Sequence, residues 1–242
     1  MSGWHRAATA GGLLAAAGAV AQGAPGVTAL AGLRPLWPRL AGTGRPGHVA
    51  LTFDDGPDGA STPQFLDLLA RRGVRATFFL LGEMITRFPD LPGRMTAEGH
   101  EVAVHSWDHR NHLRHLPGRA LDQLARTADL AEARGGVRPR FFRPPYGVLS
   151  TAGLRAAATV GLQPVLWTTW GRDWAAEATP GSVLRTVTSG LTGGGTVLLH
   201  DSDCTSAPGA WRSAYGAVPE LLSWCAGRGL EVGPLAEHGL PR

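Results

Sequence analysis

The feature that most constrains this fold is an alternation of two kinds of segment, which begins at His48 and continues almost to the C-terminus. Short apolar runs alternate with longer segments whose apolar residues recur at helical spacing. This pattern is typical of βα units and a parallel sheet. The runs predicted as strands are 49–53, 74–81, 101–105, 140–143, 163–168, 196–199 and 230–232. The segments predicted as helices are 62–72, 91–98, 118–134, 151–160, 180–191 and 215–228. Seven alternations predict an α/β barrel, complete or incomplete, because an open doubly wound sheet usually has fewer strands.

Composition limits the chain to a few classes of protein. Its 242 residues are enough for one barrel-sized domain or two small ones. The net charge of +4 is low, and the basic residues form no run interleaved with aromatic ones, so we expect no nucleic-acid partner. Cys204 and Cys225 are not part of a CxxC pair, which excludes a cysteine zinc site. They could form one disulfide or remain thiols, and we favour thiols.

The N-terminal residues differ from the rest of the chain. Residues 1–26 contain a weakly apolar run, Ala7–Ala21, in which Ala19-Val20-Ala21 would serve as a signal-peptide cleavage site. The stretch is consistent with a secretory signal or with a disordered arm, and it is too short and too rich in glycine for a membrane span. Residues 27–47 are predicted to form a connector, and residues 48–242 the folded domain.

The first predicted strand ends in two adjacent carboxylates, Asp54 and Asp55, and Gly56-Pro57 stops the strand there. An apolar strand would bury both charges, which is costly unless a ligand or a partner compensates them. Side chains alternate in direction along a strand, so one aspartate can hold a cation while the other faces a substrate.

Four later polar residues fall at or just after predicted strand ends: His105, Arg143, Asp173 and His200. In a parallel barrel these ends meet on one face, where active sites form. His105 and His109 are four residues apart, so both imidazoles can reach one ion. With a carboxylate they would form a two-histidine, one-carboxylate site with open positions for water and substrate. The same ligand set also suits non-haem iron oxygenases.

The remaining polar residues favour hydrolysis over oxygenation. A carboxylate that the metal does not use and a separate histidine, His200, supply a base and an acid on either side of a polarised carbonyl, as metal-assisted hydrolysis requires. Arg143 can hold Asp54 ionised and oriented through its forked guanidinium. The alternatives are an ordinary ion pair for Arg143 and a surface loop acid for Asp173.

With these residues in view, the chain resembles the polysaccharide deacetylase family, the NodB-homology domain of carbohydrate esterase family 4, from His48 to Leu235. The motifs that carry the resemblance are Thr-Phe-Asp-Asp-Gly (52–56), His-Ser-x-x-His (105–109), Arg-x-Pro-Tyr (143–146), Asp-Trp (173–174) and an apolar run ending in His200. The departures are Val197, where leucine is usual, and Gly171-Arg172, where acidic or small residues are more usual. The resemblance implies a distorted (β/α)7 barrel, with residues 48–242 as the catalytic domain.

The resemblance also implies roles for the residues at the first two motifs. Asp54 would be the general base that activates a metal-bound water, and Arg143 would anchor it. Asp55, His105 and His109 would be the metal ligands, usually of zinc, with cobalt or nickel as alternatives.

Further roles follow from the later motifs. His200 would be the general acid that protonates the leaving amine, and Asp173 would tune it. The backbone amide of Tyr146 would help to stabilise the tetrahedral oxyanion. Trp174 and Leu198 would wall the slot for the acetyl methyl group.

The resemblance predicts a monomeric, metal-dependent hydrolase that removes N-acetyl groups from an aminosugar polymer or oligomer, such as peptidoglycan or a chitin-like chain. An O-acetyl xylan esterase with the same mechanism is one alternative. A hydrolase of small amides is another, although related barrels of that kind often have incomplete metal ligands. A non-catalytic sugar-binding protein would be expected to lack Asp54 or His200, and both are present.

The sequence says less about the sugar and the location. Loops 108–116 and 202–211 would set the acceptor sugar. Four tryptophans, at positions 107, 170, 174 and 211, could stack on sugar rings or lie in the core. Because the suspected polymers lie outside the cytoplasm, we favour a secreted or membrane-tethered protein, with a cytoplasmic one as the alternative.

Overall fold

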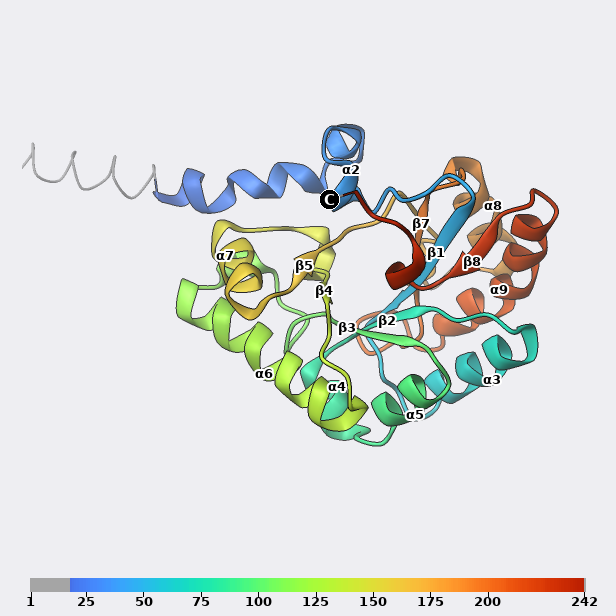
Figure 1. The fold of residues 1–242 in the computed structure, drawn as a ribbon, viewed down its shortest axis with the longest axis horizontal. Coiled ribbons are helices and arrows are strands. Elements are labelled where there is room, and N and C mark those ends of the chain that lie inside the picture. Colours follow the sequence, from blue (N-terminus) through green and yellow to red (C-terminus); the bar gives the residue numbers. More distant parts are fainter. Residues whose placement is uncertain (1–17, 242) are drawn as a thin grey trace, which may run out of the picture.

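The computed structural model describes residues 18–241, and its framework is one curled sheet in which the strands pair in parallel (Figure 1). The strands are β1 (His48–Asp54), β2 (Thr77–Leu80), β3 (Glu101–Val104), β4 (Phe141–Phe142), β5 (Gln163–Pro164), β6 (Thr169–Trp170), β7 (Thr196–His200) and β8 (Glu231–Gly233). They follow the order β5-β4-β3-β2-β1-β7-β6, and β8 pairs with β1. β5 and β6 are the two edges, so the predicted α/β barrel is confirmed in an incomplete form.

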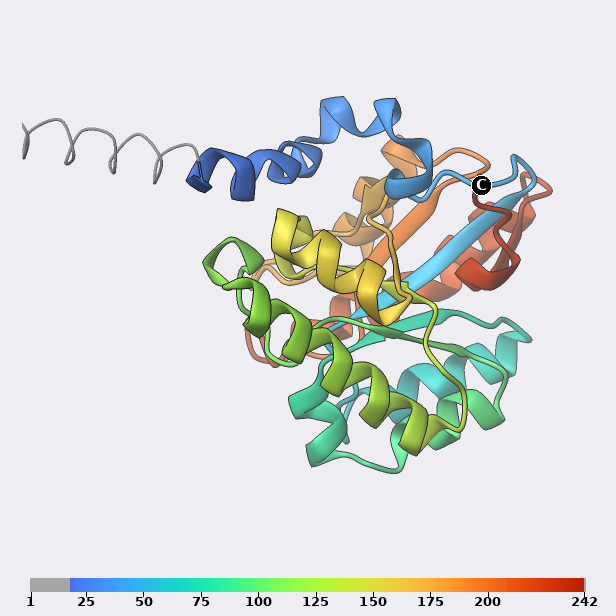
Figure 2. The ribbon, with the colours of Figure 1, turned by 60° about the vertical axis from the view of Figure 1, so that its left-hand side comes forward.

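The helices cover the outer side of this sheet (Figures 1 and 2). The longer ones are α3 (Thr62–Arg72), α4 (Gly82–Arg87), α5 (Leu91–Ala97), α6 (Pro117–Gly135), α7 (Thr151–Val160), α8 (Pro180–Gly190) and α9 (Trp211–Ala226). α3 and α7 have the predicted bounds, because Gly73 and Gly161 follow them with φ values of 64° and 78°. This left-handed conformation ends a helix and is easiest for glycine.

β1 is the centre of the sheet, and all seven of its residues are buried. It pairs with β2 on one side and with β7 on the other. The ring of Phe53 stacks on Phe78, with 5.1 Å between centroids, and packs edge-on against Phe65 of α3 at 5.0 Å. Burying each such ring stabilises the fold by about 1.5–3 kcal/mol. This packing fixes the end of β1, where the two adjacent carboxylates lie.

The predicted strand over residues 163–168 is wrong, because only residues 163–164 form a strand, β5, and the next strand, β6, begins after the predicted segment at Thr169. β5 pairs with β4, whereas β6 pairs with β7 at the opposite edge of the sheet. Between them the chain crosses the opening of the barrel, which we call the seam. Val165, Leu166 and Trp167 are buried there. The apolar run therefore indicated burial correctly, but the burial comes from side-chain packing at the seam and not from a strand ladder.

Two other predicted bounds need correction, and one helix was not predicted. The strand predicted at 74–81 is shorter, because only residues 77–80 pair with β3, and α4, which was not predicted, begins directly afterwards at Gly82. The last helix begins at Trp211 and not at Tyr215, since the Trp211 ring packs against Phe65 and Tyr215 and continues the apolar face of the helix.

Residues 24–41, which include most of the predicted connector and the last three residues of the suspected leader, pack across the seam. They contain the short helices η1 (Ala24–Ala29), η2 (Ala31–Leu36) and α2 (Pro38–Ala41), and we call them the arm. The buried Arg34 side chain donates to the Trp167 carbonyl at 3.0 Å and lies 4.4 Å from the centre of the Trp167 ring. The Leu166 amide donates to the Leu40 carbonyl at 2.7 Å. The arm thus supplies the contacts that a closing strand would make in a complete barrel.

Two smaller predictions can also be compared with the structure. Cys204 and Cys225 are free thiols, as favoured from the sequence. Among residues 18–241, no helix is both long enough and apolar enough to cross a membrane. Most of the suspected leader, residues 1–17, lies outside the described residues.

Candidate active site

The predicted site residues meet in one pocket at the carboxyl ends of the strands. The pocket has a volume of about 270 Å³. Its wall includes all three predicted metal ligands and most of the other predicted site residues: Asp54, Asp55, His105, His109, Tyr146, Trp174, Leu198 and His200. Asp54 and His200 end the neighbouring strands β1 and β7, and His105 directly follows β3, which only β2 separates from β1.

Asp54 is held by Arg143, whose side chain is fully buried. Nη1 of Arg143 donates to Asp54 Oδ1 at 2.7 Å and to Thr52 Oγ1 at 2.8 Å, and Nη2 donates to the Leu166 carbonyl at 2.7 Å. The guanidinium also lies 4.0 Å from the centre of the Phe79 ring. Burial lowers the pKa of Arg143, and the Asp54 carboxylate opposes that change. The ion pair occupies one oxygen of Asp54 and leaves the other for the pocket.

Asp55, His105 and His109 form a cluster suited to a metal ion. Oδ1 of Asp55 lies 3.3 Å from Nε2 of His105 and 3.5 Å from Nε2 of His109. One candidate ligand atom from each residue lies within 4.8 Å of the others. His105 Nδ1 is 2.8 Å from the Arg143 carbonyl and donates to it, so Nε2 carries the lone pair.

The buried Oδ1 of Asp55 tests whether a metal fits this cluster. Within the described part of the chain this atom accepts no hydrogen bond, although it is buried. Oδ2 of the same carboxylate accepts from the hydroxyl of Thr205. A buried carboxylate oxygen that faces two imidazole nitrogens without a proton donor is the arrangement expected of a metal ligand. The residues present therefore fit a divalent cation.

The electrostatics keep these ligands in the forms that bind metal. Burial lowers the pKa of His109 to about 4, so its imidazole is neutral at pH 7. Burial acts to raise the pKa of Asp55, but its close contact with His105 and the positive charge of His200 across the pocket outweigh burial and lower the pKa below its ordinary value. Metal ions bind neutral imidazole and ionised carboxylate.

His200 lies across the pocket and is paired with Asp173. Its Nδ1 is 3.0 Å from Asp173 Oδ1, and its backbone amide donates to Asp173 Oδ2 at 2.7 Å. Burial alone would lower the pKa of His200, but the Asp173 carboxylate, with smaller contributions from Asp55 and Asp54, raises it to about 10. The imidazole is therefore protonated at neutral pH, and the nitrogen not bonded to Asp173 is the one available to a ligand.

Sequence reasoning did not single out four residues of the pocket wall: Gly147, Trp167, Thr205 and Ser206. Gly147 has a φ of 67°, and a β-carbon at this position would lie 2.5 Å from the Trp167 ring, so the close approach requires glycine. The signal for Trp167 was its place in an apolar run, which also fits a core residue. Thr205 and Ser206 lie in loop 202–211, which was expected to set the acceptor sugar, but no pattern distinguishes these two residues within it.

The four tryptophans proposed as sugar contacts divide into two groups. Trp170 and Trp174 line the pocket, with 4.8 Å between their ring centroids. Trp211 is buried in the core, and Trp107 lies under the guanidinium of Arg126, 3.5 Å from the ring centre. Only the first two are placed to contact a ligand of this pocket.

Comparison with known proteins finds matches in one protein family. The profile of the polysaccharide deacetylase family matches residues 41–165, slightly more than half of the chain. The chain is 36% identical to a chitooligosaccharide deacetylase of Bradyrhizobium over 78% of its own length and 89% of that protein. It is 38% identical to a peptidoglycan-N-acetylglucosamine deacetylase of Listeria monocytogenes, over 66% of its length but only 34% of that protein. It thus spans about a third of the Listeria relative.

A solved structure shares the fold at lower identity. A carbohydrate esterase family 4 pseudoenzyme from Bacillus anthracis superposes with a TM-score of 0.72 at 25% identity, covering 79% of this chain and 65% of that one. The fold therefore occurs both in proteins named for deacetylation and in a protein described as a pseudoenzyme, so the side chains of the site must decide between the two.

Proposed function

Since the chain belongs to the polysaccharide deacetylase family, we propose that it is a metal-dependent hydrolase that removes N-acetyl groups from an aminosugar polymer or oligomer, peptidoglycan or chitin-like. One observation carries this proposal. The cluster of Asp55, His105 and His109 shares a pocket of about 270 Å³ with a buried carboxylate, Asp54, and a protonated imidazole, His200. Metal-assisted hydrolysis of an amide uses this combination of metal ligands, base and acid.

The metal would be held by Asp55, His105 and His109. Two imidazoles and a carboxylate are common zinc ligands, and cobalt or nickel can use the same donors. When bound, the ion would polarise the acetyl carbonyl and acidify the attacking water. The hydrogen bond from His105 to the Arg143 carbonyl fixes the tautomer and the orientation of that ring.

Asp54 would accept the proton of the attacking water. Its Oδ1 accepts a hydrogen bond from Arg143, so the carboxylate is held in one orientation, while the second oxygen is free to act as a base. The contacts of Arg143 with Thr52 and Leu166 keep the guanidinium from turning away.

His200 would donate a proton to the leaving nitrogen. An amine leaves poorly as an anion, so breaking the carbon–nitrogen bond needs a proton at that atom. Asp173 bonds Nδ1 of His200, which leaves Nε2 as the atom that delivers the proton. Leu198, Trp174 and Trp167 form the apolar part of the wall, where the acetyl methyl group would lie.

Two alternative functions would use part of the same site. An O-acetyl esterase would use the same base and metal but would depend less on His200, because an alcohol leaves more readily than an amine. A non-catalytic protein would bind sugar without turnover, and one structural neighbour, from Bacillus anthracis, is described as a pseudoenzyme. Against the second alternative, Asp54 and His200 are both present and both bonded to their partners.

Acetate release tests the proposal. The purified protein, with its metal content measured, would be assayed on chitooligosaccharides, peptidoglycan fragments and acetylated xylan, with and without a chelator. We expect chelator-sensitive release from an aminosugar substrate. Release from xylan alone would favour the esterase, and no release from metal-loaded protein would favour a binding role or a small-amide substrate.

A further inference from the structure

A second cavity, of about 560 Å³, opens beside the catalytic pocket and shares His109 and Tyr146 with it. The rest of its wall consists of three arginines, a second histidine and one asparagine: Arg110, Arg114, Arg119, His115 and Asn111. These residues come from the loop after β3, from the short helix η3 (His112–Arg114) and from the first turn of α6. We call this second space the basic cavity. The side chain of Tyr146 lies between the two spaces, and its residue is 60% exposed.

The positive charge of the basic cavity is only partly compensated. Asp108 lies 3.1 Å from Nη2 of Arg119 and 3.6 Å from Nε of Arg110. Arg114, in contrast, has no carboxylate within ion-pair distance among residues 18–241. One carboxylate for three guanidinium groups leaves an excess of positive charge beside the catalytic pocket, which favours an anionic ligand.

His115 is the second sign that this cavity takes a ligand. The residue is only 4% exposed, yet neither ring nitrogen has a hydrogen-bond partner within the described residues. Buried polar groups are normally paired, and an unpaired one costs about 1–3 kcal/mol. The backbone carbonyl of His115 accepts a hydrogen bond from the side chain of Gln22 at 3.2 Å, so the segment that precedes the arm helps to hold this loop in place.

The loop that carries the arginines is also held firmly at its start. Oε1 of Gln123, on α6, accepts from the backbone amides of Trp107 at 2.9 Å and Asp108 at 3.1 Å. Oγ of Ser106 lies 2.8 Å from Nε2 of His112. A loop fixed at several points keeps its cationic side chains in the positions that an extended ligand would meet, which lowers the ordering cost of binding.

We propose that the basic cavity binds a carboxylate on the sugar next to the one whose acetamido group enters the catalytic pocket. The inference rests on the proposed function and specifies its substrate class: a carboxylated aminosugar chain is preferred over a neutral one. Arg114 is the principal contact because its guanidinium has no partner to give up, and a guanidinium pairs with a carboxylate through two parallel hydrogen bonds. The exposed Tyr146 ring offers a stacking surface for the sugar ring that links the two sites.

A matched pair of substrates tests this inference. Tetrasaccharides prepared from peptidoglycan, from which an amidase has removed the stem peptides so that each muramic acid unit carries a free carboxyl group, would be compared with the same tetrasaccharides after methyl esterification. We expect kcat/KM to be about tenfold higher for the acid than for the ester, mainly through KM. The difference should shrink as ionic strength rises, because salt screens exposed charges.

Arg114→Gln should remove most of this preference. The variant is expected to lower kcat/KM about tenfold on the acid and to leave both the ester and a neutral chitotetraose unchanged. Arg185→Gln is the control: Arg185 is exposed on α8, the substitution removes the same charge, and no change is expected on any substrate.

The outcomes separate this inference from the proposed function. Equal kcat/KM for acid and ester, or equal losses on both in Arg114→Gln, would overturn the carboxylate site while leaving the deacetylase intact. If no substrate released acetate, the proposed function would fail. Calorimetric titration of the metal-loaded protein with acid and ester would then still decide whether the basic cavity distinguishes them.

Discussion

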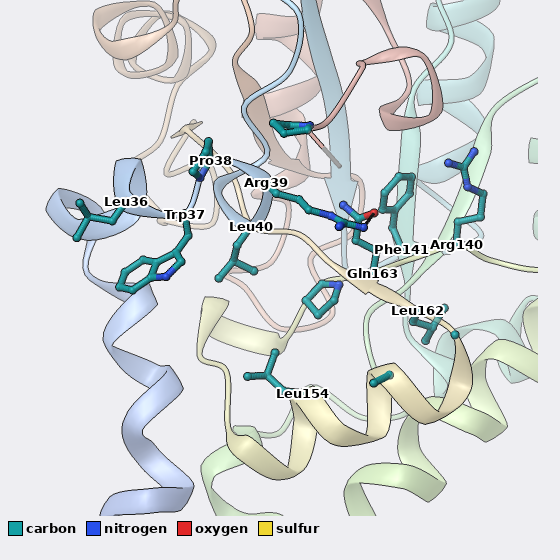
Figure 3. Close-up of a pocket in the computed structure, with 14 residues that line it drawn as sticks. Leu36, Trp37, Pro38, Arg39, Leu40, Arg140, Phe141, Leu154, Leu162 and Gln163 are labelled. Carbon is teal, nitrogen blue, oxygen red and sulfur yellow. Dashed lines mark hydrogen bonds between the residues drawn. The ribbon is translucent and has the colours of Figure 1, made fainter.

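The catalytic pocket differs sharply from the larger cavity on the arm side of the molecule. That cavity, of about 850 Å³, is roughly three times larger and lies between the arm, β4–β5 and α7 (Figure 3). Its wall is mainly apolar, with Leu36, Trp37 and Leu40 from the arm facing Leu154 and Leu162. Among residues 18–241, those that line it include no carboxylate and no histidine. Within this part of the chain the larger space therefore has no acid, base or metal ligand, whereas the smaller one has all three.

The comparison shows that buried charge, and not size, marks the reactive site. Keeping Arg143, Asp54 and Asp55 out of water is costly, and such groups persist only where partners or ligands compensate them. Perturbed ionisable groups in a cleft are a sign of function. The arm-side cavity involves no comparable cost of burying charge, because its mainly apolar side chains need no hydrogen-bond or ion-pair partner.

The largest expected effect is that of Asp54→Asn on turnover. Loss of the carboxylate should lower kcat about a thousandfold, because the attacking water loses its base. Metal content, measured by plasma emission spectrometry, should not change, since Asp54 is not in the ligand cluster. His109→Ala, a ligand variant, should lower both metal content and activity.

Activity above a few per cent of wild type in Asp54→Asn would contradict the role of Asp54 as base. Such activity would also weaken the conclusion that buried charge marks the reactive site, because the buried ion pair of Asp54 with Arg143 would then have only a structural role.

His200→Ala should have the second largest effect, and the effect should depend on the leaving group. We expect a loss of about a hundredfold on an N-acetyl substrate and a much smaller loss on an aryl acetate, whose leaving group needs no proton. Initial rates on the two substrates provide the measurement. Equal losses on both would rule out His200 as the general acid.

The pH profile supplies a control for this assignment. The pKa of His200 is raised mainly by Asp173, so the acid form persists above neutral pH and is lost as the pH rises through that pKa. Asp173→Asn removes the cause of the increase. The pH at which the activity of this variant on the amide substrate falls on the alkaline side should therefore be lower than in wild type. An unchanged alkaline fall in activity would contradict the proposal that Asp173 raises the pKa of His200.

Arg34→Gln tests whether the arm serves the catalytic pocket as well as its own cavity. Arg34 loses its bond to the Trp167 carbonyl and its position over the Trp167 ring, so we expect a loss of about 2 kcal/mol in the free energy of unfolding. Because Trp167 lines the catalytic pocket, KM for the N-acetyl substrate should also rise several-fold. Urea denaturation and steady-state kinetics would measure the two effects.

Arg39→Gln is the matched control in the same arm. Arg39 is exposed and donates only to the side chain of Gln163, so stability should change by less than about 0.5 kcal/mol and KM should stay the same. An Arg34→Gln variant that behaved like this control would show that the arm does not position Trp167.

The smallest effect is expected from filling the arm-side cavity. Ala158 is an exposed residue of α7 that lines it, and Ala158→Leu keeps a strong helix former at the position. Stability should change by less than about 0.5 kcal/mol, and kcat/KM should equal that of wild type. Loss of activity in this variant would break the comparison, because it would show that the larger cavity contributes to turnover.

Several parts of the site could be predicted because each depends on local sequence. Asp54, Asp55, His105 and His200 were found because each follows an apolar run, and parallel strands bring their ends together. Thr205 could not be found in this way, since it meets Asp55 from 150 positions away along the chain.

The sequence by itself determined the βα alternation, the parallel sheet and the set of residues that can bind a metal and move protons. These follow from periodicity and from the ends of strands, which are properties of short segments. The tertiary structure decided where the barrel opens, which tryptophans face the pocket and where positive charge collects beside it. These features depend on contacts such as that of Arg34 with Trp167, 133 positions apart, whose pairing no local pattern specifies.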